Sequence, residues 1–330
     1  MSRRWSVELE RWPYQRPFII ARGTFTHALN LVVTLQEGPW IGRGECEAHE
    51  YDQDRANGLR DRARAFLEAH APALDRDRLA TLLEAGPLRN AIDCALWDLE
   101  AKRSQVSVAA RLGPLHLTRL PITGTVSLDE PAVMAAQAQS LVASASVLKL
   151  KLGTTATQDR DRLAAVRTAC PDHELIVDAN GGWTADDFAR MVPALADSRV
   201  RLIEQPLAPG RDTNLLDVAS PIPLCADEGL TDRHSLAVLP PGYSVINIKL
   251  DKCGGLTEAL ALTEDAKARG IDYMVGSNGG TSLAAAPAFW LGAEARVVDI
   301  DSPTMLASDR PAAMRFSDGW VFAPTTELWG

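Results

Sequence analysis

Eight short runs rich in Val, Ile and Leu follow one another through the chain after its first third, and helix-like segments separate them. The runs cover residues 122–127, 147–152, 174–178, 201–204, 223–227, 245–249, 272–276 and 297–301. Helical periodicity with Ser, Thr or Pro starts marks residues 131–145, 157–170, 184–195, 256–269 and 281–291. Eight β-then-α units are typical of a closed barrel, so we predict an α/β protein with a modified (β/α)₈ TIM-type barrel over residues 119–304.

The first 118 residues have a different pattern. Residues 18–20 and 31–35 are apolar runs in an alternating stretch, which indicates a small antiparallel sheet with a mobile loop at 22–27. From about residue 54 to 103 the apolar period is helical. The last segment, 305–330, adds aromatic residues but no further β-α unit. We therefore predict an α+β capping domain built from residues 1–118, to which the C-terminal segment 305–330 returns.

The overall charge limits the classes of partner. The chain has 330 residues, a net charge of −9 and a pI near 5.2, which argues against nucleic acid or an anionic membrane as a partner. Five cysteines lack C-x-x-C spacing, and no apolar run reaches the length of a membrane span or resembles a signal peptide. We predict a cytoplasmic protein with reduced cysteines that acts on a small molecule. A homo-oligomer is possible, and the sequence does not decide it.

Three successive strands of the predicted barrel end in acids, namely Asp178, Glu204 and Asp227. Function gathers at the C-terminal ends of barrel strands, so the three carboxylates should face one spot. Unpaired, they would repel one another, and an all-oxygen ligand set favours Mg²⁺. The sequence therefore predicts one Mg²⁺ site, although any single one of these acids could instead cap a helix.

Lysines accompany these acids on two other strands. Lys149 and Lys151 lie two positions apart, so they share one face of their strand, and Lys249 ends the sixth strand. A lone strand of this kind would be a solvated edge strand. In a closed ring of eight, however, the second and sixth strands are opposite each other. Lys151 and Lys249 would then face a bound molecule from two sides, as two-base proton transfer at one carbon requires.

Asp299 and Asp301 form a second acidic group on the eighth strand, again on one face. This layout fits a zwitterion whose carboxylate binds Mg²⁺ and whose ammonium group binds these two acids. One lysine would remove the proton next to the carboxylate, giving an enediolate, and the other would return it and invert the centre. The alternative is that the two aspartates only begin a turn before Pro303.

Five motifs resemble the enolase superfamily, and within it the muconate-cycloisomerase-like subgroup. In family order they are Lys149-Leu150-Lys151, Asp178-Ala179-Asn180, Glu204-Gln205-Pro206, Ala226-Asp227-Glu228 and Asn247-Ile248-Lys249. The Asp299-x-Asp301 pair resembles that of dipeptide epimerases, in which it holds the substrate's α-ammonium. The resemblance implies that Lys151 and Lys249 exchange the α-proton of the C-terminal residue of a dipeptide.

The same resemblance assigns further residues. It implies substrate contacts from Lys149, Thr125 and the stretch Ser277-Asn278-Gly279, and it places Asn180 and Glu228 beside the metal ligands. Arg22, in the capping domain, could pair with an acidic side chain and so favour L-Ala-D/L-Glu. The alternative for Arg22 is an ordinary solvated charge.

Other functions remain open at this point. A muconate cycloisomerase or an o-succinylbenzoate synthase would keep the lysines and the metal but has no use for Asp299 and Asp301. A Schiff-base aldolase would need one lysine and no metal. A barrel that binds a metal-linked ligand without turnover is the non-catalytic alternative.

Overall fold

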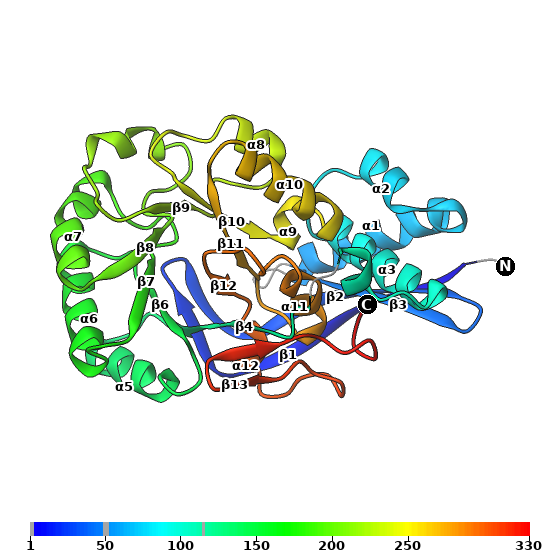
Figure 1. Cartoon of the computed structure of the whole chain (residues 1–330), viewed down its shortest axis with the longest axis horizontal. Coiled ribbons are helices and arrows are strands. Elements are labelled where there is room, and N and C mark those ends of the chain that lie inside the picture. The colour runs from blue at the N-terminus through cyan, green and yellow to red at the C-terminus, as the bar shows by residue number, and fades with distance from the viewer. Residues whose placement is uncertain (1–2, 49–52, 114–115) are drawn as a thin grey trace.

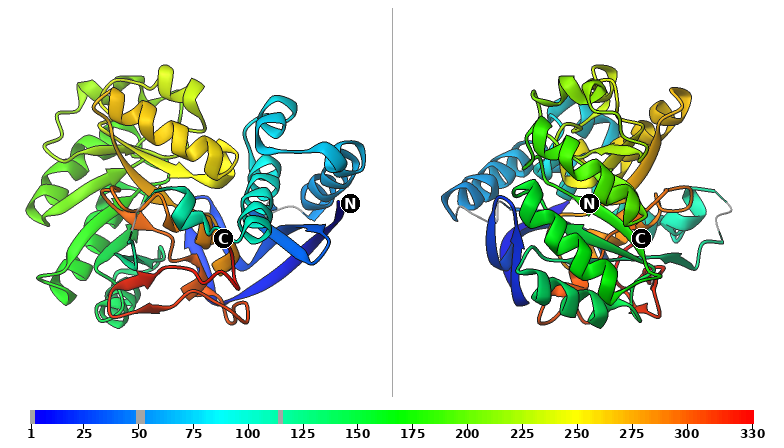
Figure 2. Two further views of the ribbon diagram at one scale, coloured as in Figure 1. Left: turned by 45° about the vertical axis from the view of Figure 1, so that its right-hand side comes forward. Right: turned by 90° about the vertical axis from the view of Figure 1, so that its left-hand side faces the viewer.

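The computed structural model describes residues 3–48, 53–113 and 116–330, and it has two lobes, a cap and a barrel (Figures 1 and 2). The cap contains a three-stranded antiparallel sheet, ordered β1-β2-β3, with helices against it. Its strands are β1 (Arg4–Ile20), β2 (Gly23–Glu37) and β3 (Trp40–Glu47). Its helices are α1 (Gln53–His70), η1 (Ala71–Ala73), α2 (Arg76–Leu82), α3 (Pro87–Ser104) and α4 (Val108–Arg111).

The prediction of a mobile loop at residues 22–27 is wrong, because strands β1 and β2 pair almost to the end of their hairpin. Phe18 pairs with Phe25 and Ile20 with Gly23, so the turn is confined to Ala21 and Arg22. The rings of Phe18 and Phe25 lie 6.3 Å apart in a small apolar cluster of their own. This cross-strand aromatic contact stabilises the hairpin up to its tip. Arg22 therefore sits in a two-residue turn and not in a long loop.

Two glycines allow α3 to lie directly on the sheet of the cap. A Cβ atom at Gly42 would lie 2.2 Å from the carbonyl oxygen of Ala95, and one at Gly44 would lie 2.1 Å from that of Ala91. Both distances are far below van der Waals contact, so a side chain at either position would push the helix away. The resulting close packing fixes the sheet, and with it the hairpin that extends toward the barrel.

The barrel contains the eight predicted strands in parallel, and each prediction is confirmed within one or two residues at either end. The strands are β5 (Thr123–Val126), β6 (Val147–Lys151), β7 (Glu174–Asp178), β8 (Val200–Glu204), β9 (Leu224–Ala226), β10 (Val245–Lys249), β11 (Asp272–Gly276) and β12 (Val298–Asp299). They follow one another in chain order around the sheet. β6 and β10 are therefore four strands apart, as predicted.

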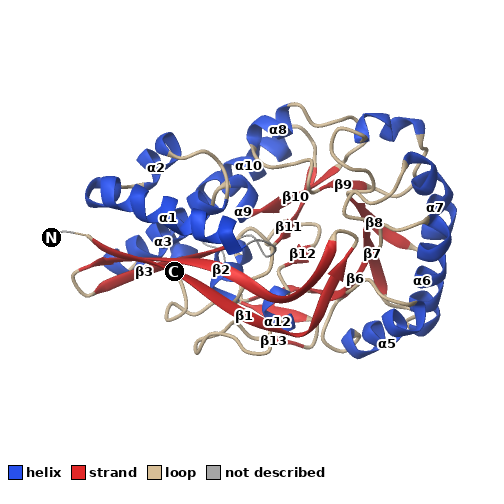
Figure 3. Cartoon of the chain, turned by 180° about the vertical axis from the view of Figure 1, so that it is seen from behind, coloured by secondary structure: helices blue, strands red, loops and turns tan. Residues whose placement is uncertain are grey.

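Helices cover the outside of this sheet, and α5, α6 and α7 form one wall of the molecule (Figure 3). The helices of the barrel are α5 (Pro131–Leu141), α6 (Ala156–Ala169), α7 (Ala185–Asp197), η2 (Asp212–Asp217), α8 (Arg233–Ala237), α9 (Leu250–Cys253), α10 (Leu256–Ala268), α11 (Ser282–Phe289) and α12 (Ser302–Met305). Thr155 and Thr184 cap α6 and α7 through their hydroxyl groups, as expected of Thr before a helix.

Side-chain hydrogen bonds join the first and last strands of the sheet. The hydroxyl group of Thr123 donates to Asp299 over 2.7 Å, and the backbone N–H of Thr125 donates to Asp301 over 2.8 Å. The ring is thus nearly closed, and the two aspartates help to connect β12 with β5.

The period of two along each strand separates the barrel wall from its interior. Outward residues such as Leu148, Leu150 and Val177 belong to the large core between strands and helices. Inside the ring, a smaller apolar cluster lies below the strand-end acids, and three of its members come two positions before Asp178, Glu204 and Asp227. It consists of Ile176, Leu202, Cys225, Val245 and Met274. The inward positions further along the strands carry the lysines and acids, so the charged groups rest on an apolar floor.

The C-terminal segment contacts both lobes. Its strands β13 (Phe316–Ser317) and β14 (Trp320–Phe322) pair with β4 (Arg119–Pro121) in a small antiparallel sheet. Farther on, the guanidinium group of Arg43 donates to the carbonyl oxygen of Leu328, and the indole of Trp329 donates to that of Cys94. The domain boundaries at 118/119 and 304/305 stay a prediction. All five cysteines are buried and unbonded to one another, and no helix in the described ranges is long and apolar enough to cross a membrane.

Candidate active site

A cavity of about 490 Å³ opens at the C-terminal ends of the barrel strands, and the tip of the β1–β2 hairpin contributes to its lining. Most of the predicted site residues line it. They are Arg22, Thr125, Lys149, Lys151, Asn180, Asp227, Glu228, Lys249, Ser277, Asn278, Gly279, Asp299 and Asp301. Asp178 and Glu204 lie deeper, with 0% and 1% of their surface exposed. The structure therefore brings the residues chosen from the sequence to one place.

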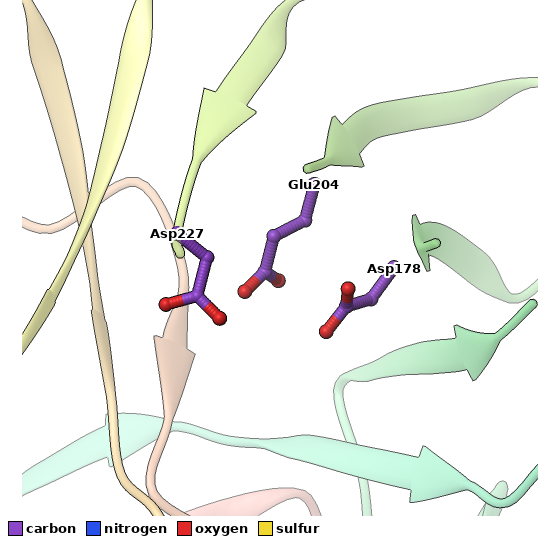
Figure 4. Close-up of side chains that lie close together, drawn as sticks. All are labelled: Asp178, Glu204 and Asp227. Atoms are coloured by element: carbon purple, nitrogen blue, oxygen red, sulfur yellow. The ribbon is translucent and has the colours of Figure 1, made fainter. Parts of the chain in front are cut away.

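The three strand-end acids converge at the base of this cavity (Figure 4). One oxygen atom from each of Asp178, Glu204 and Asp227 lies within 4.8 Å of the others. The parallel register places Asp178 directly beside Glu204, and Asp227 follows the end of β9. Three buried carboxylates at this separation, with oxygen as the sole donor type, fit a hard divalent cation such as Mg²⁺.

The protonation of these acids differs with their neighbours. Burial and the adjacent Asp178 carboxylate raise the pKa of Glu204 to about 7. Burial would also raise the pKa of Asp227, but the ammonium groups of Lys249 and Lys252 hold it well below its usual range. The three carboxylates therefore need nearby cations to stay ionised, and a bound metal ion would be one such cation.

Lys149 connects the three strand-end acids, called the triad from here on, to the second acidic group, which is Asp299 and Asp301. Its ammonium nitrogen lies 3.1 Å from Asp178, 2.7 Å from Glu204 and 2.6 Å from Asp299. The side chain is 2% exposed. Burial acts to lower the pKa of Lys149, but Asp299, Glu204 and Asp178 raise it well above its usual range. Lys149 is therefore a fixed positive charge at the centre of the site.

The two predicted bases each contact a different member of the triad. The ammonium group of Lys151 lies 2.6 Å from Asp178, and that of Lys249 lies 2.8 Å from Asp227. Their strands, β6 and β10, are on opposite parts of the ring. Burial lowers the pKa of Lys249, but Asp227 and Glu204 raise it, and the net shift is upward. The two amines thus flank the triad from two sides.

Lys252 is a fourth lysine at this site, and the sequence analysis missed it. Its ammonium group lies 2.6 Å from the carboxylate of Asp227 and 3.1 Å from the carbonyl oxygen of Asn247. Helix α9 begins directly after Lys249, so the residue three positions on turns back toward the same carboxylate. The three-residue spacing of Lys249 and Lys252 could have indicated that both lysines contact the same group, but a helical turn directly after a strand was not predicted.

Asp299 and Asp301 lie close together but are not equivalent. Asp299 already binds Lys149 and the Thr123 hydroxyl group. Asp301 accepts the backbone N–H of Thr125. Burial and the neighbouring Asp299 raise the pKa of Asp301 to about 6. Asp301 is thus the carboxylate better placed to accept a positive charge from a ligand.

The remaining wall of the cavity comes from the loop after β11 and from the cap. The backbone N–H of Ser277 donates to the Asp299 carbonyl oxygen over 3.0 Å, and Ser277 also contacts Ser302. The carbonyl oxygen of Gly279 accepts a hydrogen bond from Asn30 of the cap over 2.9 Å. Asn278, between them, lines the cavity. This loop is therefore held from both lobes.

Arg22 and Glu228 form an ion pair across the opening of the cavity. Their closest nitrogen and oxygen atoms lie 3.0 Å apart. The same oxygen of Glu228 accepts the side-chain amide of Asn180 over 3.2 Å. Burial and the carboxylates of Asp227 and Asp178 raise the pKa of Glu228. The hairpin of the cap is thereby connected to the loop that carries a triad member.

Two family models match the chain. One is described as enolase C-terminal domain-like and matches residues 133–327, and the other, the N-terminal domain of mandelate racemase and muconate lactonizing enzyme, matches residues 4–113. The chain belongs to the enolase superfamily. The resemblance predicted from the five motifs is thus confirmed, and so is the fold of a capped TIM-type barrel.

Two similar proteins in the superfamily are named as an epimerase and a racemase. The chain is 41% identical to the L-Ala-D/L-Glu epimerase of Escherichia coli (strain K12), over 94% of this chain and 96% of that protein. It is 38% identical to the N-acetyl-D-glutamate racemase of a Pseudoalteromonas species, over 91% of this chain and 95% of that protein.

A solved structure of a superfamily member from Agrobacterium tumefaciens is also similar. It is described as homologous to dipeptide epimerases, with bound sodium, L-Ala-L-Glu and an ordered loop. Its TM-score is 0.94 at 38% identity, and the match covers 99% of this chain and all of that one. These superfamily members resemble the chain over nearly its whole length, so both lobes are shared.

Proposed function

We propose that this superfamily member is a Mg²⁺-dependent dipeptide epimerase, which inverts the α-carbon of the C-terminal residue. The observation that carries the proposal is the position of Lys151 and Lys249 on opposite strands of the ring, each beside a different member of a buried acid triad. An α-carbon held between two amines can lose its proton to one and gain a proton from the other. The names of the similar epimerases support this reaction.

One Mg²⁺ per chain would be held by Asp178, Glu204 and Asp227. When bound, the ion supplies positive charge that offsets the negative charge developing on the substrate carboxylate as the α-proton leaves. Lys149 adds a fixed positive charge next to the same place. Asn247 orients one ligand, because its amide group donates to Glu204 over 2.7 Å.

Lys151 and Lys249 take the roles of the two bases. The amine on one face removes the α-proton, and the ammonium group on the other face delivers one. Phe18 of the cap lies over Lys151, with the ring centre 6.0 Å from the ammonium nitrogen. Together with Tyr14 and Ile20 it places apolar surface over the lysines and limits the access of water.

The substrate we propose is a dipeptide such as L-Ala-D/L-Glu. Its α-ammonium group would bind Asp301, with Asp299 and Thr125 beside it, and Ser277, Asn278 and Gly279 would form the wall near the peptide. Arg22 would pair with the acidic side chain of the C-terminal residue. Because the E. coli relative is named for L-Ala-D/L-Glu, this dipeptide is the first to test.

A racemase of N-acyl amino acids is the second candidate, since one similar protein is an N-acetyl-D-glutamate racemase. An N-acetyl group carries no positive charge, so it would leave the buried carboxylate of Asp301 without a cationic partner. The aspartate pair therefore favours the dipeptide. Comparing L-Ala-L-Glu with N-acetyl-L-glutamate in the assay below separates the two.

Proton–deuterium exchange at the α-carbon in D₂O tests the proposal directly. We expect the wild-type protein with Mg²⁺ to incorporate deuterium into L-Ala-L-Glu and to form its epimer, as followed by NMR. Lys151→Ala and Lys249→Ala should each abolish epimerisation, because one of the two faces then lacks its proton donor or acceptor. Epimerisation that persists in either variant would refute the two-base assignment.

We also infer a cytoplasmic location, because five buried, unbonded thiols suit a reducing compartment. A homo-oligomer remains a prediction.

A further inference from the structure

The Arg22 side chain is exposed, whereas its backbone is held in place by the barrel. The hairpin tip is attached to the barrel on two sides. The backbone N–H of Leu128, after β5, donates to the Ile19 carbonyl oxygen over 2.9 Å. A Cβ atom on Gly153, after β6, would lie 3.2 Å from the Cβ of Ala21, so the tip also packs on that loop. The Arg22 side chain itself is 56% exposed. It can therefore change partners by rotation alone.

Glu228 is held differently. Its side chain is 17% exposed, and one of its oxygens accepts from both Arg22 and Asn180. Its other oxygen is buried and has no hydrogen-bond partner among the described residues. The carboxylate of Glu228 is thus anchored by Asn180 even when Arg22 leaves. It lies next to Asp227 in the chain, so any second anion brought near it is repelled.

Both members of this pair line the cavity, and the hairpin contributes no other basic residue to it. The other lining residues of the hairpin are the apolar or aromatic side chains of Tyr14, Phe18 and Ile20. An acidic substrate side chain that enters near the hairpin would meet Arg22 already paired with a carboxylate. If it binds Arg22, it brings a second carboxylate to a guanidinium group that Glu228 already contacts, so the two anions compete for the same positive charge.

We propose that Glu228 is a specificity-determining residue, which competes with the acidic side chain of the substrate for Arg22. This inference rests on the proposed function, because it concerns the C-terminal residue of the dipeptide. A substrate without that charge leaves the Arg22–Glu228 pair intact and binds without displacing it. Glu228 thereby weakens the preference for acidic dipeptides and lets the cavity accept neutral ones.

Four proteins and two dipeptides test this competition. The proteins are the wild type, Glu228→Gln, Arg22→Gln and the double variant. The dipeptides are L-Ala-L-Glu and L-Ala-L-Met, whose C-terminal side chains are similar in length but differ in charge. Dissociation constants are measured by calorimetry with saturating Mg²⁺ at low ionic strength, and α-deuterium exchange is followed in parallel.

We expect Glu228→Gln to bind L-Ala-L-Glu about fivefold more tightly, the effect of losing a competing partly exposed pair worth about 1 kcal/mol. Glutamine keeps the acceptor for Asn180, so binding of L-Ala-L-Met should not change. In the Arg22→Gln background the same substitution should not favour L-Ala-L-Glu, because the group under competition is gone.

Two results would overturn the inference. An equal change for both dipeptides would assign Glu228 to the support of the metal site, and weaker binding of L-Ala-L-Glu would show that Glu228 positions Arg22 for the substrate. The failure of the proposed function has a different signature. In that case the charge-dependent binding pattern is present, but the wild-type protein exchanges no α-deuterium with either dipeptide.

Discussion

Replacing Lys149 by methionine should destabilise the metal-free protein strongly. The lysine is buried and shared by three carboxylates at 3.1 Å or less, and methionine has a similar length without the charge. Among the described residues, Asp299 would keep only the Thr123 hydroxyl group as a side-chain partner. Removing one partner of a buried ion pair costs about 3–5 kcal/mol, because a charge is left uncompensated. In a chain of 330 residues, with an unfolding entropy of about 2.1 cal/mol/K per residue, that corresponds to a decrease of about 4–7 °C in Tm.

Added Mg²⁺ should restore part of this loss. A cation at the triad offsets the charge on Asp178 and Glu204, which Lys149 no longer neutralises, so Mg²⁺ should raise the Tm of Lys149→Met more than that of the wild type. Differential scanning calorimetry with EDTA and with saturating Mg²⁺ measures both values. Lys267→Met is the matched control, since Lys267 makes two ion pairs at the surface, which are worth about 1 kcal/mol or less each.

The reasoning would be refuted in either of two ways. Lys149→Met could melt at the wild-type temperature in EDTA, in which case the lysine does not stabilise the acidic cluster. Alternatively, Mg²⁺ could raise the Tm of both proteins equally, in which case the ammonium group and the metal do not act on the same carboxylates.

Two further predictions concern the ammonium site and the cap. Because Asp301 has a pKa of about 6, raised by burial and Asp299, it is ionised above that pH and neutral below it. With saturating Mg²⁺, kcat/KM of the wild type for L-Ala-L-Glu should fall as the pH drops through about 6. The Asp301→Asn variant should have a low kcat/KM at every pH and should lack this pH dependence. A wild-type pH profile in the variant would contradict the assignment of Asp301. In the cap, Gly44→Ala should cost about 1–3 kcal/mol in urea unfolding, because its Cβ would meet the Ala91 carbonyl oxygen at 2.1 Å. Gly58→Ala in α1, with open space around it, should be neutral or slightly stabilising, and equal losses in both variants would refute the packing argument.

The position of the triad was predictable because it depends on sheet geometry alone. Parallel strands align their C-terminal ends, and the register indeed pairs Lys151 with Asp178 and Asp178 with Glu204. The period of two then decides which residues point inward. A sequence shows both properties, so the strand-end residues and the opposite positions of β6 and β10 could be deduced without coordinates.

The contacts made by each charge could not be deduced in this way. The partners of Lys149 come from three different strands, and the distances between them depend on the diameter of the ring. The pairing of Arg22 with Glu228 requires the hairpin to be long enough to reach the barrel, and the sequence analysis placed a loop there instead. Lys252 depends on a single helical turn between β10 and α10. Each of these is a tertiary contact between separate elements. The sequence pattern of one element does not indicate which other element it will contact.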